Sequence, residues 1–200
     1  LPIPGKPNTL WNPVNLCSEK YMGLQQARFN MIEQQIRPWQ VLDPNVLELL
    51  EEIPREDFVP GEYRPLAYAD ISIPLDHDQY MTPPRIVARM LQSIGIRPND
   101  TALEIGTGSG YVTALMAKMA RQVYSVDINP ECIEIAKKNL ATQNIHNVTL
   151  EQGDAANGWH QHDHYDVIAI TGSLPVLPDA FWRLLNRGGR LFAVIGKGPI

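Results

Sequence analysis

The sequence has little of what would assign it to a disulfide-stabilised, membrane or nucleic-acid-binding class. Only two cysteines occur, Cys17 and Cys132, without CxxC spacing. This excludes a disulfide framework and a four-cysteine zinc site, and it favours a reducing, cytoplasmic location. No apolar run approaches the roughly 18 residues that a membrane span needs. The 17 lysines and arginines are outnumbered by 22 aspartates and glutamates, giving a net charge of −5. Such an acidic chain has no general attraction for nucleic acid or an anionic lipid surface.

What remains is the composition of a globular protein of 200 residues, with 44% hydrophobic and 20% charged residues. We expect three segments. Residues 1–21 form an irregular, proline-rich N-terminal extension without the basic start and apolar run of a signal peptide. Residues 22–98 form a helical cap, and residues 99–200 form the main domain.

Three helices are predicted in the cap. The first follows from an apolar periodicity that ends at a proline. The other two each begin with a capping residue followed by proline, at Asp43-Pro44 and at Thr82-Pro83, and Gly95 is placed to close the last one. The helices are expected over residues 22–37, 44–52 and 83–95.

In the main domain, short apolar strands alternate with helices. This alternation predicts a doubly wound, parallel, Rossmann-like α/β sheet. Ligands of such sheets bind beyond the carboxyl ends of the strands, where the strand order reverses. Strands are expected over residues 101–105, 122–126, 148–150, 165–170 and 190–195, with helices beginning near residues 111, 130 and 178.

The first strand runs into the sequence EIGTGSG. Glycines at alternate positions let the backbone turn sharply and approach a ligand closely. The dinucleotide fingerprint is GxGxxG, whereas the spacing here is GxGxG, and a glutamate precedes the first glycine by two positions. A carboxylate there would repel a phosphate but could pair with an ammonium group, which favours S-adenosylmethionine over NAD. The predicted cofactor-binding residues of this loop are Glu104, Gly106, Thr107, Gly108 and Gly110.

Two further strand ends carry acids. Asp127 closes the second strand, where a carboxylate accepts hydrogen bonds from ribose hydroxyls. Asp154 follows the third strand, where it can accept from an adenine amino group. Either acid alone could be an ordinary loop or cap carboxylate, but three acids at three strand ends favour one cofactor site. We therefore predict that Asp127 with Ile128, and Asp154 with Ala155, bind the cofactor.

Four segments together resemble the bacterial protein-L-isoaspartate O-methyltransferases: MIEQQIRP at 31–38, REDFVP at 55–60, EIGTGSGY at 104–111 and NVTLEQGD at 147–154. The resemblance runs from about Met22 to the end of the sequence. It implies a class I S-adenosylmethionine-dependent methyltransferase that methylates the carboxyl of L-isoaspartyl and some D-aspartyl residues, as a repair step for damaged proteins. Such enzymes usually have seven strands, so we expect either that this sequence stops before the last two or that the chain has lost them.

The resemblance also implies an acceptor loop. The family typically reads PIGxGQTIS there, and this sequence reads PLDHDQYMT over residues 74–82. Gln79 is kept, and Thr82 supplies a hydroxyl where the family's serine helps to bind the acceptor carboxylate. Thr82 and Gln79 are therefore the predicted catalytic residues. Thr82 has a second interpretation, as no more than the N-cap of the helix that begins at Pro83.

Three positions of this loop depart from the family pattern. Asp76 and Asp78 replace its two glycines, and Tyr80 replaces a threonine. Each carboxylate would oppose an anionic acceptor by about 1 kcal/mol at a distance of about 4 Å in water. Two rival functions follow: a methyltransferase of the same fold with a different acceptor, and a non-catalytic module that binds S-adenosylmethionine and serves as a regulator.

The implied reaction requires neither an acid–base residue nor a metal. A carboxylate has a pKa of about 4 and is already ionised at neutral pH. The histidines at His160, His162 and His164 alternate in a way that could supply metal ligands, but no cysteine or second cluster accompanies them, and we predict no metal site. The predicted partner is a protein or peptide substrate that carries isoaspartyl residues.

Overall fold

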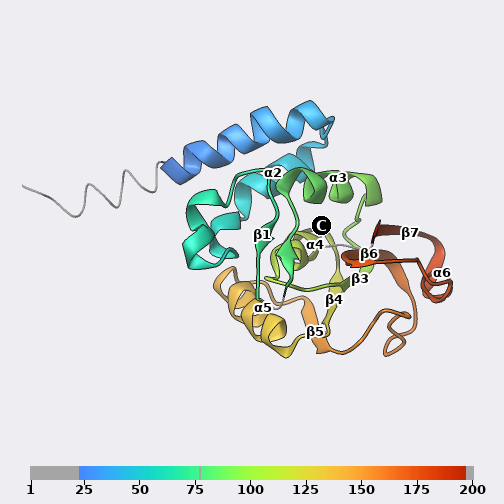
Figure 1. The fold of residues 1–200 in the computed structure, drawn as a ribbon. Helices are drawn as coiled ribbons and strands as arrows, with labels where there is room; N and C mark the ends of the chain where they lie inside the picture. The colour runs from blue at the N-terminus through green and yellow to red at the C-terminus, as the bar shows by residue number, and fades with distance from the viewer. Residues whose placement is uncertain (1–22, 77, 197–200) are drawn as a thin grey trace, which may run out of the picture.

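The computed structural model describes residues 23–76 and 78–196, and the extension expected over residues 1–21 lies outside them. Within the described residues, the main sheet has five parallel strands in the order β5-β4-β3-β6-β7 (Figure 1). The chain proceeds from β3 to one edge of the sheet and then crosses back to build the other half. This confirms the predicted doubly wound α/β fold. The strands are β3 (Thr101–Ile105), β4 (Gln122–Asp127), β5 (Val148–Gln152), β6 (Tyr165–Leu174) and β7 (Leu185–Ile195).

Three helix boundaries follow capping signals of the sequence. The Asp43 side chain accepts a hydrogen bond from the Asn45 N–H at 2.9 Å, and the Asn129 side chain accepts one from the Glu131 N–H at 3.0 Å. Gly95, with φ of 51°, ends its helix in the left-handed conformation, as predicted. The helices are α2 (Pro44–Glu52), α3 (Pro84–Ile94), α4 (Tyr111–Met119), α5 (Pro130–Thr142) and α6 (Ala180–Arg183).

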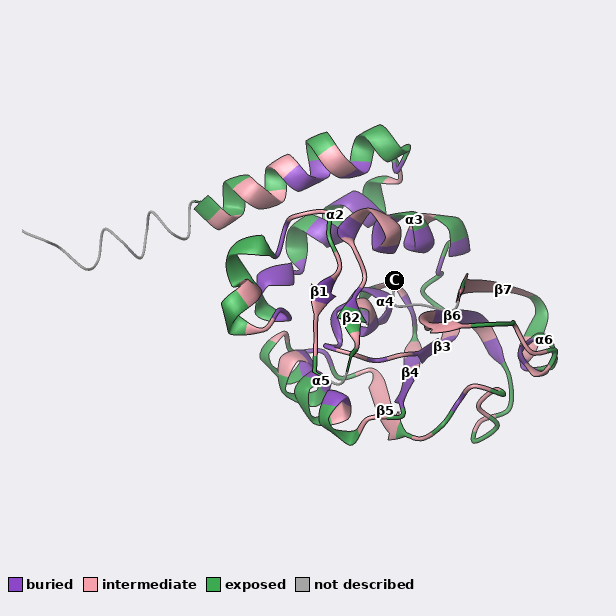
Figure 2. Cartoon of the chain, in the orientation of Figure 1, coloured by how far each residue is buried: buried purple, intermediate pink, exposed green. Residues whose placement is uncertain are grey.

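The sheet is covered on both faces. Because side chains alternate along a strand, Val167 joins a buried cluster with residues of α3 and α4, whereas the next residue, Ile168, joins a second cluster with Phe181 of α6. Figure 2 shows the buried residues concentrated in the central strands and on the inner sides of the helices. The strand ends are consequently the part of the sheet that a ligand can reach.

The first helix differs in detail from the prediction. It is α-helical over residues 23–31, continues as a π-helix, η1 (Ile32–Ile36), and ends in a 3-10 turn, η2 (Arg37–Trp39). Pro38 lies within the first turn of η2, where its missing N–H requires no partner. The helix therefore does not end before Pro38 as predicted, but continues through it for one 3-10 turn.

Elements near the end of the described chain also differ from expectation. The helix expected from residue 178 is only four residues long. Strand β6 extends past Ile170, because after a register shift it pairs with β7 again at Leu174 and Ile195. Among the described residues, no helix combines the length and apolarity that a membrane crossing requires.

Between α2 and α3, the chain forms two 3-10 helices, η3 (Arg55–Asp57) and η4 (Gly61–Leu66), and a small hairpin. The hairpin strands β1 (Ile73–Pro74) and β2 (Tyr80–Met81) are antiparallel. The N–H of Leu75 donates to the Gln79 carbonyl at 2.8 Å, which closes the loop. The predicted acceptor loop is thus the tip of this hairpin.

Gly110 provides a test of the packing between α4 and α5. Its φ is 82°, and a Cβ there would lie 2.9 Å from the Ala136 Cβ. We expect Gly110→Ala to lower the free energy of unfolding by about 2 to 4 kcal/mol, through a left-handed backbone and a steric collision. Urea denaturation measures this. Gly95→Ala is the matched control, because its φ is also positive but no atom lies within 4 Å of the added Cβ. Its expected loss is about 1 kcal/mol, and equal losses for the two variants would contradict the collision.

Candidate functional site

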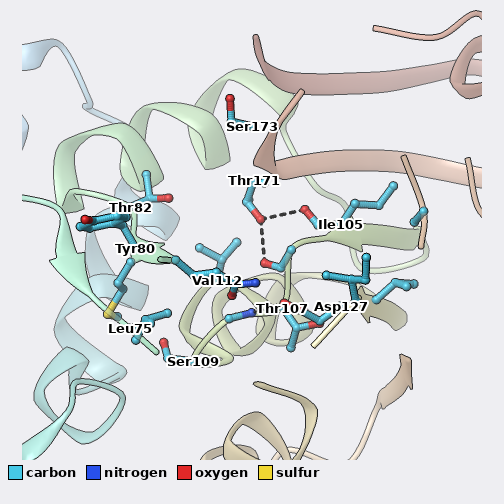
Figure 3. Close-up of a pocket in the computed structure, with 18 of the residues that line it drawn as sticks. Leu75, Tyr80, Thr82, Ile105, Thr107, Ser109, Val112, Asp127, Thr171 and Ser173 are labelled. Atoms are coloured by element: carbon cyan, nitrogen blue, oxygen red, sulfur yellow. Dashed lines mark hydrogen bonds between the residues drawn. The ribbon is translucent and has the colours of Figure 1, made fainter. Parts of the chain in front are cut away.

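A cavity of about 760 Å³ lies beyond the carboxyl ends of β3, β4 and β6. One wall is the glycine loop between β3 and α4, and the acceptor loop forms another. Figure 3 shows Thr82 and Tyr80 on one side of this space and Asp127 on the opposite side. The structure thus brings most of the predicted site residues around one cavity. These are Gln79, Thr82, Gly106, Thr107, Gly108, Asp127, Ile128, Asp154 and Ala155.

The glycine loop lies directly against the end of β6. Gly106 has φ of 100°, and a Cβ on it would lie 2.6 Å from the backbone nitrogen of Gly172, so no side chain fits. The Thr171 hydroxyl donates to the carbonyl oxygens of Ile105 at 3.1 Å and of Gly106 at 2.9 Å (Figure 3). Thr171 is absent from the predicted site, although its position at the carboxyl end of β6 is a signal that would have identified it.

Asp127 both holds the glycine loop and faces the cavity. Its Oδ2 accepts the Gly108 N–H at 2.9 Å, and its Oδ1 accepts the Asn129 N–H at 2.9 Å. Each carboxylate oxygen keeps a further lone pair with which it can accept a hydroxyl hydrogen bond. The adjacent Ile128 is 62% exposed and also lines the cavity. Together they present an acceptor beside an apolar surface, which suits a ribose and an adenine ring.

Asp154 lies farther along the same wall. Its Oδ1 accepts the Ala156 N–H at 2.9 Å, and the side chain is exposed. Ala155 is buried beside it, and both residues line the cavity. The carboxylate that follows β5 is therefore in reach of a ligand that also contacts Asp127.

Glu104 and Gly110 do not line the cavity, contrary to the prediction. Alternation along β3 turns Glu104 away from the cavity-lining Ile105 and toward α4. There it is fully buried and accepts hydrogen bonds from the hydroxyls of Thr113 at 2.5 Å and Ser125 at 2.7 Å. The predicted direct pairing of Glu104 with a ligand's ammonium group is not the geometry found. Gly110 serves the close approach of α4 to α5.

The environment of Glu104 favours its neutral form. Burial raises the pKa of Glu104 to about 8, although the hydrogen bonds from Thr113 and Ser125 oppose the shift. Its Oε1 has no hydrogen-bond partner. The Ser125 hydroxyl also lies 2.7 Å from that of Thr107, which lines the cavity. A short chain of hydroxyl groups therefore connects the buried carboxyl to the cavity wall.

One of the altered positions of the acceptor loop has a left-handed backbone. Asp78 adopts a left-handed conformation, with φ of 55°, where the pattern has a glycine. Its exposed side chain lines the cavity, as does Tyr80. The Gln79 Oε1 accepts a hydrogen bond from the Cys132 thiol at 3.2 Å, which ties the loop to α5. The predicted Gln79 thus has a structural partner as well as a place at the site.

Leu75 joins the acceptor loop to the glycine loop. Its Cδ1 lies 3.3 Å from the position that a Cβ on Gly108 would occupy. Leu75 lines the main cavity and also a second one of about 190 Å³, where Asp76 lies. Asp76 is exposed and does not line the main cavity, so only one of the two added carboxylates faces it.

Thr82 does not act as a helix cap. Helix α3 has Pro83 at its N-cap position and no capping hydrogen bond from a side chain, so the second interpretation of Thr82 is wrong. Thr82 is half-buried and lines the cavity, and its carbonyl accepts a hydrogen bond from the Arg55 Nη2 at 2.8 Å. Arg55 and Tyr111 also line the cavity, and neither was predicted to do so. The only sequence signal for these two residues was that each belongs to a family motif, REDFVP for Arg55 and EIGTGSGY for Tyr111.

The three histidines that alternate in the sequence, His160, His162 and His164, do not line the main cavity. The His162 ring stacks on Tyr124 with centroids 3.7 Å apart, and its Nε2 lies 3.1 Å from a Glu151 oxygen. His160 and His164 are exposed. In the part of the chain that the structure describes, no three His, Cys, Asp or Glu side chains are arranged to hold a metal ion.

The raised pKa of Glu104 predicts a pH-dependent stability. Its value of about 8 exceeds the ordinary 4.5, so the folded state binds the proton more tightly, and the contribution to stability is lost as pH rises from about 4.5 to 8. The free energy of unfolding of wild type relative to Glu104→Gln should therefore fall across this range, by up to about 1.4 kcal/mol per pH unit. Urea denaturation of both proteins at several pH values measures the difference. A difference that does not change with pH would contradict a neutral Glu104.

Comparison with known proteins supports one family. The family model described as protein-L-isoaspartate(D-aspartate) O-methyltransferase matches residues 26–199. The protein-L-isoaspartate O-methyltransferase of Protochlamydia amoebophila is 42% identical over 169 residues, which cover 84% of this chain and 80% of that protein. A Synechococcus protein of the same name is 38% identical over 172 residues, covering 86% and 70% of the two chains.

A solved structure gives the same result. The structure of a protein-L-isoaspartate O-methyltransferase matches with a TM-score of 0.70 and 29% identity. The match covers 83% of this chain and 54% of the solved one, so this chain spans about half of that protein's length. Sequence motifs, fold and site architecture therefore agree: the chain belongs to the protein-L-isoaspartate(D-aspartate) O-methyltransferase family.

Proposed function

We propose that this chain binds S-adenosylmethionine in the main cavity and transfers its methyl group to the carboxyl of an isoaspartyl residue in a protein or peptide. The observation that carries the proposal is the one cavity that joins Asp127 and Asp154 to Thr82. A methyl donor held at Asp127 and an acceptor held at Thr82 would meet inside that space (Figure 3). Membership of the family supports the same reaction.

The residues present fit the cofactor. The glycine loop lines the cavity at Gly106, Thr107 and Gly108, so it can hold a ligand with little side-chain bulk in between. Asp127 would accept hydrogen bonds from the ribose hydroxyls, Ile128 would cover the adenine ring, and Asp154 would accept from its amino group. None of these roles requires a basic residue for phosphate, in keeping with a cofactor that carries none.

The mechanism requires little from ionisable side chains. When bound, S-adenosylmethionine supplies an electrophilic methyl group on a sulfonium centre. The acceptor carboxylate is ionised at neutral pH, so no general base is needed. Thr82 would orient that carboxylate through its hydroxyl, while Leu75, Met81 and Val112 supply apolar surface that excludes water. Catalysis would then come from positioning.

The two rival functions have less support. A different acceptor was suggested by the carboxylates of the acceptor loop, yet only Asp78 lines the main cavity, whereas Asp76 lines the second one. A non-catalytic module would not need a hydroxyl at position 82, whereas Thr82 lines the cavity and is not used as a cap. The isoaspartyl reaction accounts for both findings.

The decisive experiment is methyl transfer from labelled S-adenosylmethionine to an isoaspartyl peptide, with the aspartyl peptide of the same sequence as control. We expect label on the isoaspartyl peptide alone. Equal labelling of the two peptides would point to a different acceptor. Cofactor binding without any transfer would support the non-catalytic module.

The cofactor site itself is tested by Asp127→Ala. We expect the affinity for S-adenosylmethionine to fall by roughly tenfold to a hundredfold, which is the effect of losing a hydrogen bond to a charged group. Isothermal titration calorimetry measures the dissociation constant. Asp127→Asn should fall between wild type and alanine, because it keeps one acceptor oxygen. The exposed Asp163, outside the cavity lining, provides the control Asp163→Ala. An unchanged affinity in Asp127→Ala would exclude Asp127 from the cofactor site.

A further inference from the structure

Arg55 is a buried cation that forms no ion pair with any described residue. Its side chain has no solvent exposure. The Nε donates to the Ala67 carbonyl at 2.9 Å and the Nη2 to the Thr82 carbonyl at 2.8 Å, both neutral acceptors. The Nη1 has no hydrogen-bond partner. Burying a charge without a counter-ion is costly, and burial lowers the pKa of Arg55 to about 10, which still leaves it charged at neutral pH.

Tyr111 lies against the same guanidinium. The Arg55 Cζ is 4.9 Å from the centroid of the Tyr111 ring, within range of a cation–π interaction. The Tyr111 hydroxyl is buried and also has no hydrogen-bond partner. Burial raises its pKa to about 12, so it keeps its proton and remains a donor. The two donor groups lie beside each other in one buried pair, and neither has a hydrogen-bond partner outside the pair among the described residues.

The charged side chains that line the cavity differ in sign. Among the cavity-lining residues that the structure describes, Arg55 is the one lysine or arginine, whereas Asp78, Asp127 and Asp154 are acidic. An anionic group that enters the cavity is repelled near the aspartates and attracted near Arg55. Arg55 is hydrogen-bonded to Thr82, so the attractive region coincides with the acceptor side.

We propose that Arg55, with Tyr111 beneath it, recognises the acceptor's carboxylate: its unpaired charge attracts that group, and its hydrogen bond to the Thr82 carbonyl fixes the Thr82 hydroxyl in position to meet it. The inference rests on the proposed function and names the residues that select an acidic acceptor. Both unpartnered atoms lack solvent exposure, so we assign Arg55 a positioning and electrostatic role rather than a catalytic one. The methionine carboxylate of the cofactor has the same chemistry, and the experiment separates the two.

The test compares wild type with Arg55→Met, Arg55→Lys and Tyr111→Phe in the methyl-transfer assay. A peptide with isoasparagine in place of isoaspartate serves as competitor, because it has the same shape without the charge. We expect Arg55→Met to raise KM for the isoaspartyl peptide about tenfold to a hundredfold, as for loss of an interaction with a charged group. The inhibition constant of the neutral competitor and the dissociation constant of S-adenosylmethionine should change less than about twofold.

Arg55→Lys should recover part of the lost affinity, because it restores the charge without the planar fork of donors. Tyr111→Phe keeps the ring under Arg55 and its contact with Phe58, and should raise KM several-fold while leaving stability unchanged. It carries the test if Arg55→Met does not fold. The matched control is Arg64→Met, which removes a half-exposed cation of η4 that is paired with Asp57 outside the cavity.

Three results would overturn the inference. An equal loss of cofactor affinity would assign Arg55 to the cofactor's carboxylate. An equal loss of affinity for the neutral competitor would make Arg55 a purely structural residue. An unchanged KM in Arg55→Met, or in Tyr111→Phe if Arg55→Met does not fold, would remove the pair from acceptor recognition. If wild type itself labels no isoaspartyl peptide, the proposed function fails, and this outcome is distinct from all three.

Discussion

The backbone contact between the glycine loop and the end of β6 is the constraint on which the cavity depends. Gly106 approaches Gly172 so closely that any side chain would separate them. Strands β3 and β6 are parallel neighbours in a fixed register, so their ends meet at one edge of the sheet. On the other side, Asp127 at the end of β4 accepts the Gly108 N–H. The glycine loop is thus held by β6 on one side and by β4 on the other, so this wall of the cavity is preformed.

Much of the fold could be predicted from local signals in the sequence. The helix caps at Asp43 and Asn129 and the stop at Gly95 are set by residues within a few positions of the helix ends, and the structure shows all three. The alternation of strands and helices predicted a parallel, doubly wound sheet. The tendency of such sheets to bind ligands beyond the carboxyl ends of their strands predicted where the cavity lies. Boundaries were less accurate where pairing resumes after a register shift, as in β6 and β7, because that depends on the partner strand.

The site was harder to predict, because motif membership does not state which way a side chain points. Glu104 belongs to the glycine-loop motif, but the two-residue period of β3 turns it under α4. Gly110 belongs to the same motif and is required by a neighbouring helix. Arg55 and Tyr111 reach the cavity only through tertiary packing, and no spacing rule connects position 55 with position 111. Asp78 lines the cavity in a left-handed conformation, which its residue type does not indicate, because glycine is the residue that most readily adopts it.

The contact of Leu75 with the glycine loop has a thermodynamic consequence. One side chain of the acceptor loop, Leu75, lies beside Gly108 of the loop that would hold the cofactor, and both line the cavity, so the two ligands would share this boundary. If binding of the cofactor changes the affinity for the acceptor by some factor through Leu75, binding of the acceptor must change the affinity for the cofactor by the same factor, because coupling free energies are reciprocal. A change in the affinity for the acceptor when the cofactor or its demethylated product is bound would be the measure of this coupling.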